Sequence, residues 1–397
     1  MHVRDFIKDE QFDLRDCNFV NLDISGISII KLALFYTEDL GIKDVVYTNL
    51  ENALLPDNVN LFQIIKNKSL EYVKLPPYDF SEFKFDNVEL NHTIFKKHSI
   101  LPNDANLLQK IKSKEIIYCT LPESDYSKYN FVGVNITGTN FPKNSKLPKD
   151  KNFLKNLKEK KIYGVKLPSG DYSHWDFSNI KVCCTKFSKG FIFPKDKDLF
   201  KKIYASSLSA CLFVEQNLSE YDFSDVSIAT SKFVKCELPL DRNLFINTIY
   251  GISGCSFVDM DLSYLNLNNV DLEGVSFLGE TILPYDPELF QKVKDKNISN
   301  SKFPKGDYSN YNFNNISMNF TKFPFNSILP YDVNFFNSVK SANYMSLTQN
   351  MLQNIHLYDL SKAILDLKKY EKHITDFQKT ILFNKYPDKI RNKELIL

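Results

Sequence analysis

Large apolar residues recur at every fifth position along much of this chain, a period that fits neither an α-helix nor a flat β-strand. The steps belong to a longer unit of 45 or 46 residues, which opens with Leu-Pro or Phe-Pro and continues with a Lys-rich amphipathic stretch. A unit of this kind cannot bury its apolar face alone, so the repeat predicts a stacked solenoid rather than separate globular domains. The openings begin at Leu55, Leu101, Leu147, Phe193, Leu238, Leu283 and Leu329.

The five-residue steps carry a further pattern. In GDYSHWDFSN and SEYDFSDVSI a large apolar residue holds the centre of a step, with Asp or a small residue shortly before it. In this respect the chain resembles the pentapeptide repeat family, and the resemblance covers residues 12 to about 328. The resemblance implies a mainly β fold, a right-handed quadrilateral β-helix solenoid with one step on each of the four sides of a coil. Ala is rare at the small position here, and long insertions interrupt the steps.

Each repeat holds more residues than its steps need. Six five-residue steps use thirty of the 46 residues and leave sixteen. Two more steps would need only ten, so each repeat has six residues more than eight steps require. We therefore predict two coils per repeat, with two adjacent sides of every second coil replaced by a longer segment. The segments LPKDKNFLKNLKEK at Leu147 and FPKDKDLFKKIY at Phe193 have apolar residues at helical spacing and predict short α-helices. Pro near the start supplies a fixed φ, and Asp150 and Asp196 suit an N-cap or first-turn position.

The pattern changes toward the C-terminus. The five-residue steps fade after Leu329, and apolar residues from Leu357 onward follow helical spacing. We therefore expect a β-helix with inserted helices over 1–328 and a helical segment over 329–397. Two roles remain open for that segment: it caps the last coil, or it binds a partner or a second copy of the chain. The second role would use a seven-residue apolar interval formed by Leu360, Leu367, Ile374 and Ile381.

An aromatic column runs through the repeats and has one aliphatic member, Leu265. Its rings could stack bases or grip a peptide, or they could fill the core beneath the inserted helices. Because the column lies at an inward position, two residues before an apolar centre, we predict core. The rings are Phe83, Tyr129, Trp175, Tyr221 and Tyr311.

Polar columns have equally plain explanations. A Ser column fits corner turns, in which a hydroxyl bonds the nearby backbone; it consists of Ser81, Ser127, Ser173, Ser219, Ser263 and Ser309. An Asp column could line up metal ligands, but stacked carboxylates repel and Asn217 fills one place, so a hydrogen-bonding ladder fits better. Its acids are Asp79, Asp125, Asp171, Asp261 and Asp307. The inward Cys119, Cys211 and Cys255 fit small apolar fillers.

Composition and charge narrow the function. Apolar residues make up 43% of the chain and the formal net charge is +2, so the chain folds and has no global attraction to nucleic acid or acidic membranes. We find no signal-peptide pattern, membrane span or metal-binding cysteine spacing. We therefore expect a soluble protein in the cytoplasm, or one secreted into a host cytosol without a cleaved signal. No P-loop, H-E-x-x-H or Gly-rich dinucleotide motif is present, and we predict no catalytic, metal or cofactor site.

Lysines concentrate in the predicted helices. If these helices line one edge of the coils, the edge is a basic stripe able to bind an acidic protein surface, an anionic lipid headgroup or nucleic acid, with an affinity that falls as salt rises. The alternative is a solvated helix face, partly neutralised by Glu115, Glu159 and Asp295. The candidate partner-binding residues of this basic edge are Lys110, Lys112, Lys155, Lys158, Lys201, Lys202, Lys292 and Lys294.

These features predict a non-enzymatic protein-interaction scaffold on a rigid repeat rod, with another protein as its partner. The resemblance implies two more specific roles, since some pentapeptide repeat proteins bind DNA gyrase by resembling DNA and similar β-helices occur in effectors that bacteria inject into host cells. The net charge of +2 argues against DNA mimicry here. The other alternative is a toxin or enzyme whose chemistry lies in residues 329–397, where we recognise no polar constellation.

Overall fold

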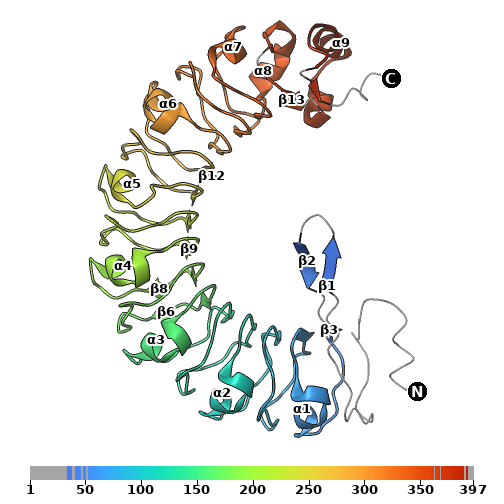
Figure 1. The fold of residues 1–397 in the computed structure, drawn as a ribbon, viewed down its shortest axis with the longest axis vertical. Helices are drawn as coiled ribbons and strands as arrows, with labels where there is room; N and C mark the ends of the chain where they lie inside the picture. The colour runs from blue at the N-terminus through green and yellow to red at the C-terminus, as the bar shows by residue number, and fades with distance from the viewer. Residues whose placement is uncertain are drawn as a thin grey trace, which may run out of the picture. The chain divides into compact units, whose positions relative to one another are not determined.

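The structure, a computed structural model, describes residues 34–37, 41–45, 48–50, 52–361, 363–366, 368–388 and 390–391. The chain divides into two compact units, residues 1–205 and 206–397. Figure 1 shows the elements of both units, coloured from blue to red along the chain. No helix among the described residues is long and apolar enough to cross a bilayer.

Parallel β-bridges join successive coils of the first unit. Lys74 pairs with Ile94, Ile94 with Thr120, Thr120 with Asn140, and Asn140 with Lys166, so the spacing alternates between 20 and 26 residues. A spacing of 20 residues equals four five-residue steps, and 26 residues is the same coil with six residues inserted. This alternation confirms the prediction of two coils per repeat with one insertion in every second coil.

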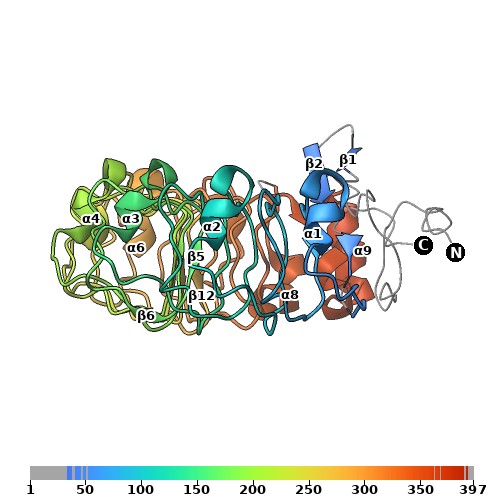
Figure 2. The same ribbon diagram turned by 90° about the horizontal axis from the view of Figure 1, so that it is seen from below.

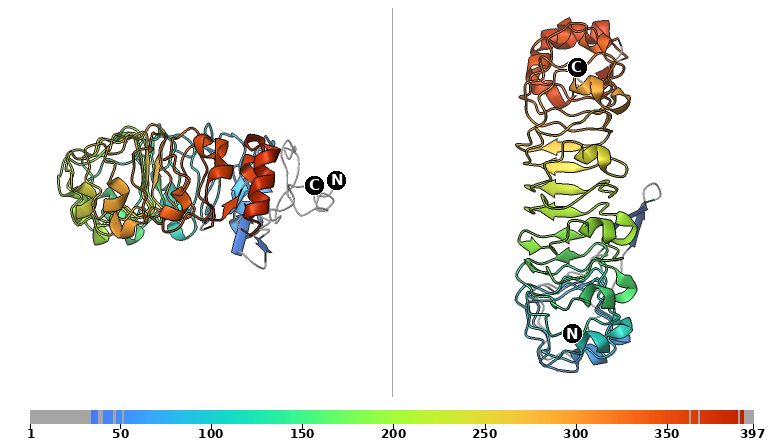
Figure 3. Two further views of the ribbon diagram at one scale, coloured as in Figure 1. Left: turned by 90° about the horizontal axis from the view of Figure 1, so that it is seen from above. Right: turned by 90° about the vertical axis from the view of Figure 1, so that its left-hand side faces the viewer.

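The second unit carries a regular parallel sheet on the corresponding side of its coils. β9 (Leu212–Val214), β10 (Lys232–Val234), β11 (Ser256–Val258) and β12 (Ser276–Leu278) pair in register, with Phe213, Phe233, Phe257 and Phe277 opposite one another. The right panel of Figure 3 shows β11 and β12 as neighbouring yellow strands. Single bridges continue the column from Ser276 to Lys302 and from Lys302 to Lys322.

The coil strands of the first unit are shorter, with two residues each. The antiparallel pair β1 (Leu34–Thr37) and β2 (Gly41–Val45) is longer. Proline explains part of the difference, because it cannot donate to a ladder and here follows the buried centres at Pro76, Pro122 and Pro168, where the second unit has Val214, Val234 and Val258. The two-residue strands are β3 (Thr48–Asn49), β4 (Val73–Lys74), β5 (Lys166–Leu167), β6 (Gly170–Asp171), β7 (Lys186–Phe187) and β8 (Phe191–Ile192).

The predicted short helices are present. Each has four residues and begins with two buried apolar side chains, such as Phe153 and Leu154 in α3, which anchor it to the coil. In the first unit α1 to α4 project from the same edge of the coils (Figure 2). The helices are α1 (Leu61–Ile64), α2 (Leu107–Lys110), α3 (Phe153–Asn156), α4 (Leu199–Lys202), α5 (Leu244–Asn247), α6 (Leu289–Lys292) and α7 (Phe335–Ser338).

The expected N-cap role of the aspartates is wrong. Asp150 lies two residues before the N-cap residue Asn152, and its Oδ1 accepts the backbone N–H of Asn152 at 3.1 Å. Asp196 makes the same bond to the N–H of Asp198. The carboxylate therefore fixes the turn that leads into the helix rather than the helix terminus itself.

The inward columns form the core. Leu167, Phe177 and Phe187 are at most 3% exposed. The aromatic column is buried as predicted at Phe83, Tyr129, Trp175 and Tyr311, and half-buried at Tyr221. The column of thiols is buried too: Cys119, Cys211 and Cys255 are at most 1% exposed, and burial raises the pKa of Cys255 to about 12.

The predicted C-terminal heptad helix is wrong. Leu360 and Ile374 are buried from non-helical backbone, Ile381 lies in the separate helix α9 (Asp376–Lys385), and Leu367 falls outside the described residues. The apolar side chains are spaced by further coil-like packing, since a bridge from Ser317 to Ser341 continues the coil past residue 328. The boundary between 1–328 and 329–397 stays a prediction. The segment also holds α8 (Gln349–Gln353) and the parallel pair β13 (Leu365–Asp366) and β14 (Ile390–Arg391).

One buried side chain holds α9 in place. Gln378 donates from Nε2 to the carbonyls of Leu352 and Gln353 at 3.2 and 2.9 Å, which joins α9 to α8. Thr375 and Gln378 form a capping box at the start of α9. The capping alternative for this segment and the partner-binding alternative both remain open.

Candidate functional site

The candidate lysines lie at the ends of the inserted helices, as the sequence predicts. The first unit carries six of them, and the second carries Lys292 at the end of α6 and Lys294 in the 3₁₀ turn Lys294–Lys296. In the first unit, Lys110, Lys155, Lys201 and Lys202 belong to α2, α3 and α4. Lys112 and Lys158 begin the 3₁₀ turns Lys112–Lys114 and Lys158–Lys160.

Seven of these eight lysines are ion-paired. One motif recurs, in which the last Lys of the helix contacts the Asp six residues earlier: Lys110 with Asp104 at 2.6 Å, Lys202 with Asp196 at 2.6 Å and Lys292 with Asp286 at 2.5 Å. Lys294 forms no ion pair within the described ranges. The remaining pairs are Lys112 with Glu89, Lys155 with Asp176, Lys158 with Glu115 and Lys201 with Asp198.

Pairing changes what this edge presents to a partner. The hydrogen bond from Lys155 holds the pKa of Asp176 at about 2, and the bond from Lys158 lowers the pKa of Glu115. The hydrogen bond to Asp104 raises the pKa of Lys110. Asp176, Glu115 and Lys110 are therefore ionised near neutral pH, and through its ion pairs the edge presents alternating charges rather than a positive stripe.

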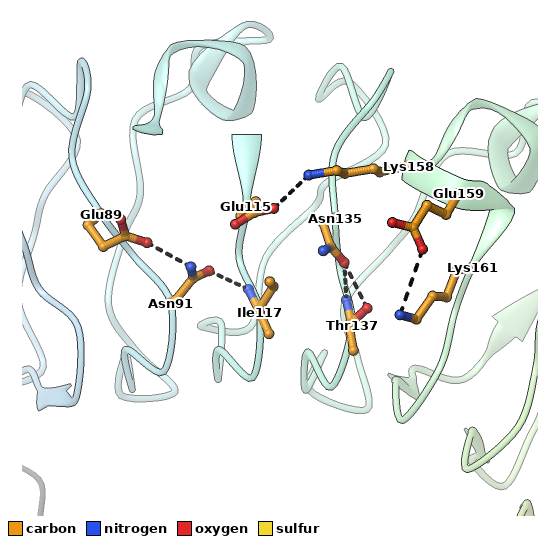
Figure 4. Close-up of polar contacts among 9 residues, drawn as sticks. All are labelled: Glu89, Asn91, Glu115, Ile117, Asn135, Thr137, Lys158, Glu159 and Lys161. Carbon is orange, nitrogen blue, oxygen red and sulfur yellow. Dashed lines mark hydrogen bonds and ion pairs between the residues drawn. The ribbon is translucent and has the colours of Figure 1, made fainter. Parts of the chain in front are cut away.

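Beside the helices, the first unit has a polar face. We define this polar face as the residues directly before and after the buried centres Leu70, Leu90, Ile116, Ile136, Ile162 and Val182. In Figure 4 the Asn91 side chain joins two coils, since its Nδ2 donates to Glu89 Oε1 at 2.7 Å and its Oδ1 accepts from the Ile117 N–H at 2.9 Å. One coil further, Asn135 accepts from both the N–H and the hydroxyl of Thr137.

Two lysines of the basic edge reach onto this face. Lys158 donates to Glu115 Oε1 at 2.7 Å, as Figure 4 shows, and Lys112 lies 3.0 Å from Glu89. The inserted segments and the polar face therefore form one continuous surface of charged and amide side chains, held by bonds between coils.

A ring stack borders the polar face. Tyr72, His92 and Tyr118 lie two residues after buried centres, and their backbones have φ of 58°, 58° and 53°. The rings stack along the coil axis, with centroids 4.3 and 5.1 Å apart and planes tilted by 18° and 22°. Burial lowers the pKa of His92, so its ring is neutral near pH 7. Tyr118 at the end of the stack is 49% exposed.

Glycines continue the same corner. Gly138 and Gly164 occupy the next two coils with φ of 68° and 70°. A Cβ on Gly138 would lie 2.2 Å from Tyr118 Cδ1, so the missing side chain makes room for the end of the ring stack. Sequence reasoning missed this feature, and the available signal was the corner position itself, which holds large rings in three coils and glycine in the next two.

The polar columns fold into turns rather than sites. In each described repeat the carboxylate or amide of the Asp column accepts the N–H of the Ser two residues later, as Asp171 does from Ser173 at 3.0 Å. No group of three or more His, Cys, Asp or Glu side chains able to hold a metal ion occurs among the residues described. Cys183 and Cys184 are half-buried, and Cys17 lies outside the described residues.

Comparisons with known proteins add little to this geometry. No protein-family model and no curated protein matches the chain. Among solved structures it is similar to HetL, a pentapeptide repeat protein involved in heterocyst differentiation regulation from the cyanobacterium Nostoc, with 16% identity over 59% of this chain and 80% of that chain and a TM-score of 0.20. It is also similar to QnrB1, a plasmid-mediated fluoroquinolone resistance protein, with 13% identity over 76% of this chain and 93% of that chain and a TM-score of 0.17. TM-scores of this size carry no argument about function.

Proposed function

We propose that this pentapeptide repeat protein is a non-enzymatic scaffold that binds another protein through the polar face and the ring stack of its first unit. The observation that carries the proposal is the ring stack. Three large rings lie at a corner where the backbone is left-handed, a conformation that glycine adopts most readily. In the next two coils the same corner has glycine, so the fold itself does not require rings.

The left-handed backbone belongs to this corner of the coil, since Cys184, Thr230 and Phe320 share it, so the exposed rings rather than the backbone mark the surface. Exposed tyrosines beside amide and charged side chains are common in protein interfaces, where the aromatic residues provide most of the binding energy and the polar rim provides specificity.

The charge pattern favours a protein over a phosphate polymer or a membrane. A nucleic acid or an anionic lipid surface would have to displace Asp and Glu from lysines that already have partners. A protein surface can match alternating charges in place. The basic edge then serves as the rim of the interface, and a bacterial effector acting in the cytoplasm or in a host cytosol is a compatible role.

The test compares protein capture by matched variants. The double variant His92→Gly/Tyr118→Gly removes two rings at positions where glycine suits the backbone, so folding is preserved. Thr230→Gly makes the corresponding change at the same corner of the second unit, where φ is 59°. We expect the first variant to lose proteins that wild type and Thr230→Gly both retain from bacterial and host lysates. Equal recovery by all three proteins would contradict the proposal.

Charge reversal tests the rim. A variant with Glu at Lys155, Lys158, Lys201 and Lys202 should weaken capture most at low salt, because exposed charges act over about 10 Å at 0.1 M salt. Binding of wild type to duplex DNA or to phosphatidylserine vesicles, abolished by the same charge reversal and unaffected by the ring variant, would favour the alternative partners instead.

A further inference from the structure

A surface cavity of about 600 Å³ lies in the second unit, on the coil where the aromatic column has its single aliphatic member. Leu265, Leu267 and Leu289 form apolar parts of its lining, and Tyr264, Tyr285 and Arg242 contribute aromatic and charged groups. Cavities of roughly 300 to 1,000 Å³ with apolar walls and a few polar groups are typical of ligand sites.

In other repeats a ring occupies this place. The Tyr129 hydroxyl donates to the Pro102 carbonyl at 2.6 Å, and the Trp175 Nε1 donates to the Pro148 carbonyl at 2.8 Å. These rings pack under the turn that precedes the inserted helix, as Trp175 does against Phe153 with centroids 4.8 Å apart.

At Leu265 the ring is missing and its hydrogen bond is supplied differently. The carbonyl of Pro239 accepts from the hydroxyl of the neighbouring Tyr264 at 3.2 Å. Leu265 itself is 4% exposed, so it closes the bottom of the space without filling it as a larger ring would. The fold therefore holds a space at this coil that is shaped for an aromatic ring and lacks one.

The charges around the cavity favour an anion. Lys292 is paired with Asp286 at 2.5 Å, while Arg242 forms no ion pair in the part of the chain that the structure describes. Arg242 is exposed on the loop before α5, and its guanidinium can bind a carboxylate through two parallel hydrogen bonds. The Tyr285 ring, 75% exposed, also lines the cavity.

We propose that this cavity binds an aromatic ring that carries a carboxylate, with the ring over Leu265 and the carboxylate on Arg242. The inference is independent of the proposed interface of the first unit. A free aromatic acid and the C-terminal aromatic residue of a peptide share this chemistry.

The test uses three small probes and the full chain. 3-Phenylpropionate supplies ring and charge, 3-phenylpropionamide supplies the ring alone, and N-acetylphenylalanine represents a peptide C-terminus. Ligand-observed NMR or calorimetry should detect the two acids, with the amide at least tenfold weaker. Tighter binding of N-acetylphenylalanine would identify a chain end as the source, and tighter binding of 3-phenylpropionate a free acid; either result supports the site.

Two variants separate the site from general surface binding. Leu265→Tyr restores the ring of the other repeats with its bond to the Pro239 carbonyl, so it fills the cavity in a folded protein and should abolish binding of every probe. Arg242→Gln should weaken the acids about tenfold and leave the amide unchanged. Unchanged binding in Leu265→Tyr, equal affinity for acid and amide, or no detectable binding of either acid would overturn the proposal.

Discussion

The two units build the same coil with different side chains on one side. In the first unit the column alternates between leucine and phenylalanine, and from Phe213 to Phe323 of the second unit it contains phenylalanine alone. The first column is Leu75, Phe95, Leu121, Phe141, Leu167 and Phe187, and the second is Phe213, Phe233, Phe257, Phe277, Phe303 and Phe323.

The packing differs accordingly. Phe213, Phe233 and Phe257 stack face to face, with centroids 5.2 and 5.6 Å apart and planes tilted by 6° and 7°. In the first unit, Phe141 instead meets the edge of Tyr126 from another side of the coil, at 5.8 Å. The five-residue step thus determines where an inward side chain lies. The size of that side chain depends on the residues it packs against, which lie across the coil in the first unit and along the column in the second.

The largest loss of stability is expected when a ring is removed from the phenylalanine column of the second unit. Phe233→Ala should lower the free energy of unfolding by about 3 to 5 kcal/mol, because the ring is 1% exposed and both Phe213 and Phe257 lose a stacking partner. Urea denaturation measures the change, and the control is Ser224→Ala, which removes only a half-buried hydroxyl that donates to Asp222. A loss below 1 kcal/mol would show that the stacked column does not stabilise the second unit.

Replacing a leucine of the first column by phenylalanine tests whether the alternation of leucine and phenylalanine contributes to the stability of the first unit. Leu121→Phe places a ring between Phe95 and Phe141, whose neighbours already fill the coil, and should cost about 1 to 3 kcal/mol through overpacking. Denaturant midpoints compared with Leu121→Met, which preserves volume, provide the measurement. An increase in stability would mean that the two columns are interchangeable and that the contrast has no energetic meaning.

A smaller effect is expected at the corner of the first unit. Gly138→Ala should cost about 1 to 2 kcal/mol, since φ is 68° and the new Cβ would displace the Tyr118 ring. In the background of Tyr118→Gly the ring is absent, so the cost should fall by about 0.5 kcal/mol or more. Additive costs in this double-mutant cycle would contradict the close approach of Gly138 and Tyr118.

Sequence reasoning captured what depends on period and missed what depends on neighbours. The two coils per repeat and the inserted helices were predicted by counting the residues between successive Leu-Pro or Phe-Pro openings. This count works because the inward positions recur at the same interval whichever apolar side chain they hold. The seven-residue interval of Leu360 and Ile374 misled, since the same spacing arises from coil interiors. The lysines of the basic edge were placed on the right elements, but their ion pairs depend on acids 3 to 43 residues away, such as Glu115 for Lys158, which period alone does not bring together.

The smallest change in stability is expected for the Lys155–Asp176 ion pair, and its pH dependence provides the test. The folded pKa of Asp176 is about 2, below its ordinary 3.8, chiefly because Lys155 donates a hydrogen bond to it. Its contribution to stability is therefore present above about pH 4 and is lost as the pH falls through about 2. Because Asp176 is half-buried and its partner Lys155 is more exposed to solvent, the pair is partly screened, and Asp176→Asn should cost about 1 kcal/mol or less at pH 7.

The same place in the second unit provides the control. Asn266 occupies it and bonds the neutral Asn243 at 3.3 Å, so Asn266→Ala should produce a change in stability that is constant with pH. Urea denaturation between pH 2 and pH 7 would show the difference between wild type and Asp176→Asn shrinking toward acid, while the difference for Asn266→Ala stays level. A gap for Asp176→Asn that remains the same at pH 2 would mean that the Lys155 pair does not stabilise the first unit in solution, and that it acts no differently from the neutral Asn266–Asn243 bond of the second unit.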